Sequence, residues 1–323
     1  MSPIVGIDVA KHSVALAIEL DNGKHRTKAK LANDPKGFAT LHAWLCTHAQ
    51  PDSWVVMEAT GIYHQALAEF LYAHGYRVCV LNPAQVALYA RRQLQRVKTD
   101  RSDAKLIASY GLRHRDQLRA WHPDLPALKT LKALVRRRDD LLQMLQMERN
   151  RLEAAQANGQ PSIQGLIDHL HARISEIQQA IEDHIDQDPD LRRQRSLLTS
   201  IDGIGDISAA LLLAELGPVK RLADAAAVTA VAGLNRRLHE SGRYQGKVCI
   251  CRTGSARLRA GLYMPALVAM RHNPVVTALK QRLHARGKHG KQIVCAAMRK
   301  LLHLAYGVLK SGTAFDPHNA LAR

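Results

Sequence analysis

Four acidic residues in the first third of the chain have the types and spacing of a metal-binding site. Asp8 lies inside an apolar segment, Gly-Ile-Asp-Val, and Glu58 ends another, Val-Val-Met-Glu. A carboxylate is costly at a buried strand position unless a cation or a hydrogen-bond donor meets it. Asp100 and Asp103 are three residues apart in a helical pattern, which places both on one helix face. We therefore expect these four acids to converge.

Such a cluster predicts phosphodiester chemistry. Like-charged carboxylates stay ionised together only where cations lie between them, and hard oxygen ligands select Mg²⁺ or Mn²⁺. Two such ions about 4 Å apart can activate an attacking oxygen and stabilise the leaving oxygen of a phosphodiester. Taken singly, each acid also has an ordinary explanation, because Asp8 could cap a turn, Glu58 could pair with a base and Asp100 could be a helix N-cap.

Apolar strands and helices surround these acids in the sequence. The patterns indicate a β-hairpin at 3–20, strands at 54–57 and 77–81, and helices at 62–74 and at 84 to about 113. Asn82-Pro83 marks the start of the last helix. A hairpin followed by alternating helices and strands predicts a mixed α/β domain over residues 1–123.

The middle of the chain, residues 124–188, predicts two long helices. Apolar residues recur at helical spacing on both sides of Asn158-Gly159-Gln160-Pro161-Ser162, which breaks the pattern. Two helices joined by a short polar turn form an antiparallel hairpin. We favour a coiled-coil hairpin for oligomerisation, with a simple spacer as the alternative.

The basic charge of the chain is concentrated in its last part. The net charge of +18 divides into +6 for residues 1–123, −3 for 124–189 and +15 for 190–323. A basic excess of this size is typical of proteins that bind polyanions or anionic membranes. No apolar run approaches the roughly 18 residues that a membrane span needs. We therefore predict that residues 189–323 form a basic, mainly α-helical domain that binds nucleic acid.

The remaining composition favours a cytoplasmic protein. The chain begins without a charged region followed by an apolar one, so that we expect no secretory signal. Five cysteines spread over 323 residues predict reduced thiols rather than disulfides. The Cys249-x-Cys251 pair has no second pair and lacks the spacing of a zinc site.

Two segments of the basic domain are candidates for phosphate contacts. The stretch Leu198–Gly217 resembles a helix-hairpin-helix with Gly203 and Gly205 in its turn, where backbone N–H groups could approach a phosphate. A helix-capping glycine in a plain helical hairpin is the alternative. The following loop and helix, with a possible short strand pair at 243–250, carry further candidate ligands of phosphate groups: Arg236, Arg237, Arg243, Lys247, Arg252, Arg257 and Arg259.

The short sequence motifs around the acids resemble those of a known family. Gly-Ile-Asp-Val-Ala-Lys-His-Ser at 6–13, Glu-Ala-Thr-Gly-Ile-Tyr-His at 58–64 and Lys-Thr-Asp-Arg-Ser-Asp-Ala at 98–104 are similar to the DEDD transposase family, the insertion-sequence recombinases related to the Piv invertase. The resemblance covers essentially the whole chain. It implies a RuvC-like, RNase H-fold catalytic domain in which Asp8, Glu58, Asp100 and Asp103 are the metal ligands.

The same resemblance implies a role for Ser241. From the residues alone, Ser241-Gly242 is an ordinary turn, and nearby His239 is an ordinary loop histidine that could help to move a proton. In the family, a serine that follows a Gly-Leu-Asn segment is the nucleophile that links covalently to DNA, and Ser241 occupies the matching place. The family further implies a bacterial, nucleoid-associated protein with donor and target DNA as substrates, a guide (bridge) RNA and a tetramer built as a dimer of dimers.

Three functions therefore stand as expectations. The first is an insertion-sequence recombinase that uses a Ser241–DNA intermediate and a Mg²⁺-binding acidic site. The second is a hydrolytic nuclease or junction resolvase that uses the same four acids with water as the nucleophile. The third is a nucleic-acid-binding protein without catalysis, which the intact acidic set disfavours.

Overall fold

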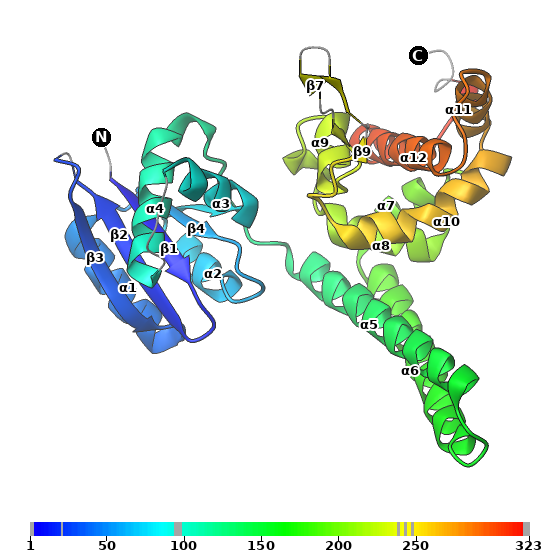
Figure 1. Cartoon of the computed structure of the whole chain (residues 1–323), viewed down its shortest axis with the longest axis horizontal. Helices are drawn as coiled ribbons and strands as arrows, with labels where there is room; N and C mark the ends of the chain where they lie inside the picture. Colours follow the sequence, from blue (N-terminus) through cyan, green and yellow to red (C-terminus); the bar gives the residue numbers. More distant parts are fainter. Residues whose placement is uncertain are drawn as a thin grey trace. The chain divides into compact units, whose positions relative to one another are not determined.

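The computed structural model describes residues 3–20, 22–93, 99–237, 240–241, 244–246 and 249–318. The chain forms two compact units, Met1–Pro123 and Asp124–Arg323 (Figure 1). Lys98, His239, Arg243 and Lys247, which the sequence singled out, lie outside the described residues. No described helix is long and apolar enough to cross a membrane.

The first unit is built on a five-stranded mixed sheet with the strand order β3-β2-β1-β4-β5. Strands β1, β4 and β5 are parallel, and β2 and β3 are antiparallel to their neighbours. Their runs of valine and isoleucine suit a sheet that is covered on both faces. The strands are β1 (Ile4–Val9), β2 (Ser13–Glu19), β3 (His25–Ala32), β4 (Trp54–Glu58) and β5 (Arg77–Leu81).

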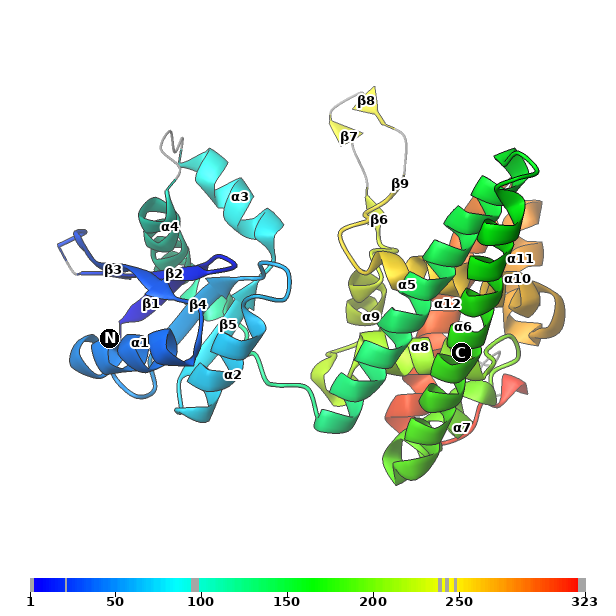
Figure 2. The ribbon, with the colours of Figure 1, turned by 90° about the horizontal axis from the view of Figure 1, so that it is seen from below.

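Two helices cover each face of this sheet (Figure 2). On one face, α1 (Pro35–His48) and α2 (Gln65–Ala73) pack against the largest apolar cluster of the unit. On the other face, α3 (Pro83–Arg92) and α4 (Asp100–Arg113) cover two smaller clusters. A short 3₁₀ helix, Arg115–Gln117, follows α4. The predicted α/β class of this part is confirmed.

Helix α4 approaches the sheet unusually closely because small residues face each other. A Cβ atom added to Gly6 of β1 would lie 2.2 Å from the backbone nitrogen of Ala108 and 2.4 Å from the backbone oxygen of Ala104. Gly111 is similarly tight against Ile4 and Val56. Only glycine at position 6 allows the helix backbone to rest on the strand.

Three features of the first unit differ from the expectation, and the first is the helix predicted at 62–74, which begins only at Gln65 and ends at Ala73. The helix predicted from 84 to about 113 is two helices, α3 and α4, although Asn82 caps α3 as expected and forms a capping box with Gln85. Strand β3 was not predicted, because exposed positions, with Lys and Arg among them, alternate with half-buried ones and Leu31 is its one buried residue. The strands at 54–57 and 77–81 are confirmed, with β4 one residue longer.

The second unit begins with the predicted pair of long antiparallel helices, α5 (Pro126–Ala154) and α6 (Gln160–Gln187), which we call the hairpin. Its tip has a small cluster of its own around Leu141, Leu145 and Ile167. Its base, which includes Leu131 and Ile185, belongs to the large core of the helices that follow. The hairpin is therefore rooted in the body of the unit.

The rest of the second unit is mainly helical, as expected. Short strands form two two-stranded sheets, β6 with β9 at the base and β7 with β8 beyond it, which together we call the ribbon (Figure 2). The helices are α7 (Pro189–Thr199), α8 (Asp206–Leu216), α9 (Ala225–Val231), α10 (Ala256–His272), α11 (Pro274–Ala285) and α12 (Lys291–Ser311), with a 3₁₀ helix at Val219–Arg221. The strands are β6 (Arg236–Arg237), β7 (Glu240–Ser241), β8 (Tyr244–Gln245) and β9 (Cys249–Ile250).

We predict that Gly6→Ala destabilises the first unit, because the added methyl group would push the backbone of α4 away from β1. Overpacking of this kind lowers the free energy of unfolding by about 1–3 kcal/mol. Urea unfolding followed by tryptophan fluorescence isolates this unit, since Trp44, Trp54 and Trp121 all lie within it.

The matched control is Gly165→Ala on α6, where an added Cβ meets nothing within 4 Å. That substitution should leave the tryptophan transition unchanged. An unfolding midpoint for Gly6→Ala equal to the wild-type value would contradict the close packing of α4 on β1.

Candidate catalytic site and nucleic-acid surface

Asp8 and Glu58 lie level with each other at the carboxyl ends of two adjacent parallel strands. Ile7 of β1 pairs with Met57 of β4, and the two acids follow directly. Ile7 and Met57 both pack into the core beneath α1 and α2. Because successive side chains of a strand point to opposite faces, Asp8 and Glu58 belong to the face covered by α3 and α4. Both side chains are half-buried.

Helix α4 brings the other two acids to the same edge. Gly111, near its end, lies against Ile4 at the start of β1, whereas Ala104 lies against Gly6 further along the strand. The helix therefore runs antiparallel to β1. Its first turn, with exposed Asp100 and half-buried Asp103, consequently lies toward the carboxyl ends of β1 and β4.

The start of α4 does not need these acids for capping. Thr99 is the N-cap, its side chain accepts a hydrogen bond from the backbone of Ser102, and the Ser102 hydroxyl completes the capping box. The alternative in which Asp100 caps the helix is therefore wrong. Both carboxylates lie in the first turn, where the positive end of the helix dipole stabilises negative charge.

The structure does not draw the four carboxylates into a closed coordination site. Among the described residues, no three His, Cys, Asp or Glu side chains lie close enough together to hold a metal ion. Asp8, Glu58 and Asp103 each interact with another group, and Asp103 accepts a 3.4 Å hydrogen bond from Ser102 Oγ. The carboxylate oxygens of the four acids are ligands of the kind that Mg²⁺ prefers, and the fold places the acids at one edge of the sheet. Their side chains are too far apart in this structure to coordinate one ion together.

The loop after Glu58 carries residues that the sequence analysis did not assign. Ile62 is 67% exposed and Tyr63 is 37% exposed, while His64 beside them is buried. His64 Nδ1 has no hydrogen-bond partner, and burial lowers the pKa of His64, which favours the neutral ring. No sequence signal marked this surface, because the apolar Ile62 fitted the helical pattern predicted from residue 62 and its exposure is visible only in the structure.

Ser241 lies on the outer part of the ribbon in the second unit. It is the last residue of β7 and pairs with Tyr244 of β8, and both residues are exposed. The expected hairpin within 243–250 is not formed by the described residues, because β8 and β9 pair with the preceding strands β7 and β6 and not with each other. Ser241 is thus accessible to a large substrate, while it lies in a different compact unit from the four acids.

Three of the predicted arginines are free to meet phosphates. Arg236 and Arg237 of β6 are exposed. Arg252 is exposed after β9 and has a φ of +60°, which non-glycine residues seldom adopt. Arg252 lines an open hollow together with Tyr263 of α10.

Two other predicted arginines have structural contacts that account for them. Arg257 forms ion pairs of 3.2 Å with Asp139 and 3.4 Å with Asp140 of α5, which tie α10 to the hairpin. Arg259 donates 2.9 Å hydrogen bonds to the carbonyl oxygens of Ala232 and Gly254. Contacts of either arginine with nucleic acid stay predictions.

In the turn between α7 and α8, helix packing and helix capping account for the two glycines without a phosphate. Gly203 has a φ of +103°, and a Cβ there would lie 2.7 Å from the Ala269 side chain of α10, so that packing already requires glycine. Gly205 is the exposed N-cap of α8. Asp206 follows in the first turn of α8 and lies 3.7 Å from Arg195, so a carboxylate already meets this helix end. A phosphate contact at Gly203 and Gly205 stays a prediction.

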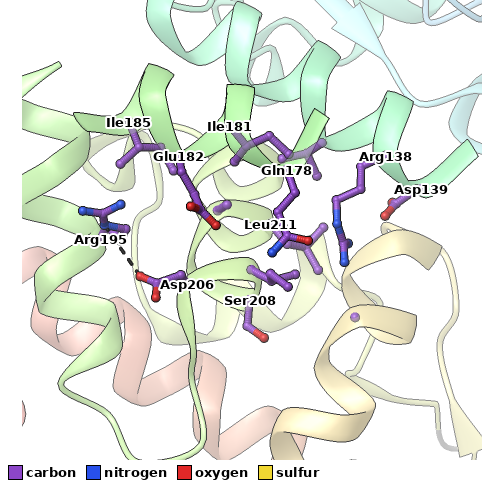
Figure 3. Close-up of a pocket in the computed structure, with 14 residues that line it drawn as sticks. Arg138, Asp139, Gln178, Ile181, Glu182, Ile185, Arg195, Asp206, Ser208 and Leu211 are labelled. Carbon is purple, nitrogen blue, oxygen red and sulfur yellow. Dashed lines mark ion pairs between the residues drawn. The ribbon is translucent and has the colours of Figure 1, made fainter. Parts of the chain in front are cut away.

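A cavity at the root of the hairpin is not a substrate site (Figure 3). It lies between α5, α6, α7, α8 and α10 and has a volume of about 90 Å³, room for roughly three water molecules. Ligand pockets usually enclose about 300 Å³ or more. Arg138 Nε is buried at this cavity without a partner, and Arg195 and Asp206 pair across its rim.

Comparisons with known proteins agree over the whole chain. A DEDD transposase model of the IS110 group, described as a transposase, matches residues 5–182. A second model, described as the transposase IS116/IS110/IS902 family, matches residues 195–281. Together the two matches include the four acids and Ser241.

Individual relatives show the same likeness. The pilin gene-inverting protein of Moraxella bovis is 32% identical over 97% of both chains. The transposase for insertion sequence element IS1328 of Yersinia enterocolitica is 28% identical over 46% of this chain and 44% of its own length. Among solved structures, RuvC of Thermus thermophilus with a Holliday junction substrate aligns over its full length with 38% of this chain, at 13% identity and a TM-score of 0.28. The chain therefore belongs to the IS116/IS110/IS902 family of transposases, enzymes that recombine DNA.

Proposed function

We propose that this transposase cuts and rejoins DNA through a covalent link to Ser241, with help from Mg²⁺ held by Asp8, Glu58, Asp100 and Asp103. The observation that carries the proposal is the placement of all four acids at one edge and on one face of the sheet. Mn²⁺ has the same preference for oxygen ligands and is the alternative ion.

The four carboxylates would act as oxygen ligands from three separate elements, β1, β4 and α4. A bound divalent ion supplies Lewis-acid stabilisation of the charge that develops on phosphodiester oxygens. Because ionised carboxylates repel one another, an ion between them favours their approach from positions already at the same edge. The half-buried setting of Asp8 and Glu58 strengthens this attraction relative to bulk water.

Ser241 would exchange one phosphoester for another. Its Oγ attacks the phosphorus and forms an Oγ–P bond, the P–O bond of the DNA strand breaks, and the departing DNA hydroxyl takes up a proton as the serine loses its own. A hydroxyl of a second strand then attacks the same phosphorus and releases the serine. No external energy source is needed, since the number of phosphoester bonds stays constant.

Hydrolysis is the second candidate. The four acids and Ser241 lie in different compact units, so that the acidic edge could cut DNA with water as the nucleophile and without the serine. Hydrolysis leaves cut strand ends that are not covalently linked to the protein. Rejoining them therefore needs another energy source.

The partners follow from the charge of the second unit and from the family. Donor and target DNA would contact the exposed Arg236, Arg237 and Arg252 through phosphates. We further propose a guide RNA, which the basic charge of this unit also suits, and a homo-oligomer, up to a tetramer, held by the hairpin. Met144, Met147 and Leu166 of the hairpin are each at least 40% exposed, which supports a partner there.

We predict that Ser241→Ala abolishes recombination and the covalent protein–DNA adduct, because alanine has no hydroxyl to attack phosphorus. The assay supplies Mg²⁺ with DNA and RNA from the flanking element, and scores joined product and adduct on denaturing gels. Ser162→Ala, an exposed serine on α6, is the matched control and should behave as wild type. Strand cutting by Ser241→Ala at the wild-type rate, without adduct in either protein, would instead establish hydrolysis.

Asp8→Asn should reduce Mg²⁺-dependent strand cleavage by about 100-fold or more, since losing about 2.7 kcal/mol of transition-state stabilisation has that effect. Cleavage is measured as a function of Mg²⁺ concentration. The control is Asp52→Asn, an exposed acid in the turn before β4. A loss confined to Ser241→Ala, with Asp8→Asn fully active, would remove the acidic site from the mechanism.

Met147→Lys should shift the protein toward smaller assemblies, because a charge on the exposed apolar face of the hairpin opposes burial against another copy. Light scattering after size exclusion gives the mass directly. Met264→Lys on α10 is the control, since Met264 is 63% exposed outside the hairpin. Equal masses for the wild type and Met147→Lys would place the oligomer contact elsewhere.

A further inference from the structure

Helices α11 and α12 bring four basic side chains together at a place that the sequence analysis did not identify. Arg282 of α11 lies close enough to Lys300 of α12 for its charge to act on that lysine. Arg299 and Lys300 act in the same way on His303. Residues 299, 300 and 303 share one face of α12 because they are three and four positions apart. We call Arg282, Arg299, Lys300 and His303 the α11–α12 cluster.

The α11–α12 cluster has no acidic neighbour to balance it. Residues 241–315 contain 14 Lys and Arg and no Asp or Glu. Within the described part of the chain, none of the four side chains forms an ion pair with an acid. Arg257, also in the acid-free stretch, differs because it reaches Asp139 and Asp140 of the hairpin.

Burial makes this lack of counter-charge costly. Lys300 and His303 are half-buried, burial lowers the pKa of both, and the neighbouring cations lower each further. The Nε2 atom of His303 is buried without a hydrogen-bond partner. The lowered pKa of His303 favours its neutral ring. The like charges of Lys300 and its arginine neighbours favour an anion that can approach several of them at once.

Packing does not require these side chains. The opposite face of α12 supplies the apolar contacts, with Leu301, Leu302 and Ala305 fully buried in the large core of the unit. Neutral side chains in the α11–α12 cluster should therefore leave the fold intact. A stability role would not explain why four basic groups gather on the outer face.

The chemistry of the cluster selects the phosphate backbone of a duplex over unpaired bases. Neither α11 nor α12 offers an exposed Phe, Tyr or Trp ring, since the single residue of these types in the two helices, Tyr306, is buried. Binding of single strands ordinarily relies on stacking of bases on such rings. Contacts from Arg and Lys to phosphates instead hold a duplex without reading its sequence.

We propose that the α11–α12 cluster binds the phosphate backbone of double-stranded DNA at a site separate from the serine-bearing ribbon. In both views of the second unit, α11 lies away from β7 (Figures 1 and 2). The site would hold the duplex beside the reacting phosphate and contribute affinity without specificity. The proposal rests on the DNA-binding part of the proposed function and not on the chemistry of Ser241.

The test measures equilibrium binding of the full chain to a 30-base-pair duplex over a range of salt concentrations. Replacing both cations in Arg282→Gln/Lys300→Gln should weaken binding about tenfold at about 0.1 M salt. It should also lower the slope of log Kd against log salt by about 2, since each lost phosphate contact lowers it by roughly 0.9. Circular dichroism checks that the double variant is folded.

The matched control is Arg149→Gln/Arg173→Gln, which removes the same charge from exposed positions of the hairpin. It should lower the salt slope by less than about 0.5. A slope for Arg282→Gln/Lys300→Gln equal to wild type overturns the proposal. So does a loss of affinity seen only with an unpaired RNA of equal length, because the cluster would then be an RNA site.

Failure of this proposal is distinguishable from failure of the proposed function. Ser241→Ala should bind the duplex with the wild-type slope, because that variant keeps all four basic groups. If the wild type itself shows no salt-dependent duplex binding, the DNA-binding part of the proposed function fails as well.

Discussion

The contact between the backbone of α4 and Gly6 of β1 sets the geometry on which the acidic edge depends. Because no side chain separates helix from strand, the helix cannot slide or tilt freely over the sheet. Its first turn is thereby fixed at the carboxyl ends of β1 and β4. Asp100 and Asp103 then reach the edge of the sheet where Asp8 and Glu58 end up by strand pairing alone. The absence of a side chain at Gly6 therefore fixes the position of α4 relative to β1 and β4, the three elements that carry the four acids.

The second unit uses basic side chains in two different ways. Where α10 meets the hairpin, Arg257 finds acids on α5 and becomes part of the architecture. On α12, neither Arg299 nor Lys300 forms an ion pair with an acid among the described residues. The distinction lies in the helix that packs opposite, because residues 124–189 have a net charge of −3, whereas residues 190–323 have a net charge of +15. Arg299 and Lys300 therefore remain available to a polyanion.

Much of the fold could be predicted because its signals are local. Continuous apolar runs identified β1, β2, β4 and β5. The segment Asn158-Gly159-Gln160-Pro161-Ser162 marked the break between α5 and α6. Strand β3 escaped prediction because it is an edge strand with one buried apolar residue. The break between α3 and α4 was not predicted, because residues 93–99 contain neither glycine nor proline and nothing local in the sequence opposes a continuous helix.

The candidate sites were predicted less evenly, for a physical reason. Spacing alone predicted one shared edge for the four acids, since strand and helix periodicity decide which face a residue occupies, although their side chains do not form a closed site. The roles of Arg257 and Arg259 could not be predicted in this way. The acids that Arg257 meets are 117 and 118 residues away, and Arg259 is held by carbonyl groups that only the folded loop presents. Long-range partners decide whether a basic side chain is structural or free.

The division of the hairpin into two apolar clusters gives it uneven local stability. Its base is part of a core shared with α7, α8 and α10, so its backbone amides are exposed to exchange only when the body of the unit opens. Its tip depends on a separate small cluster of leucines and isoleucines contributed by the two helices themselves. The tip can therefore loosen and re-form while the base stays anchored, and the end farthest from the body is the part that can adjust its shape to a neighbouring molecule.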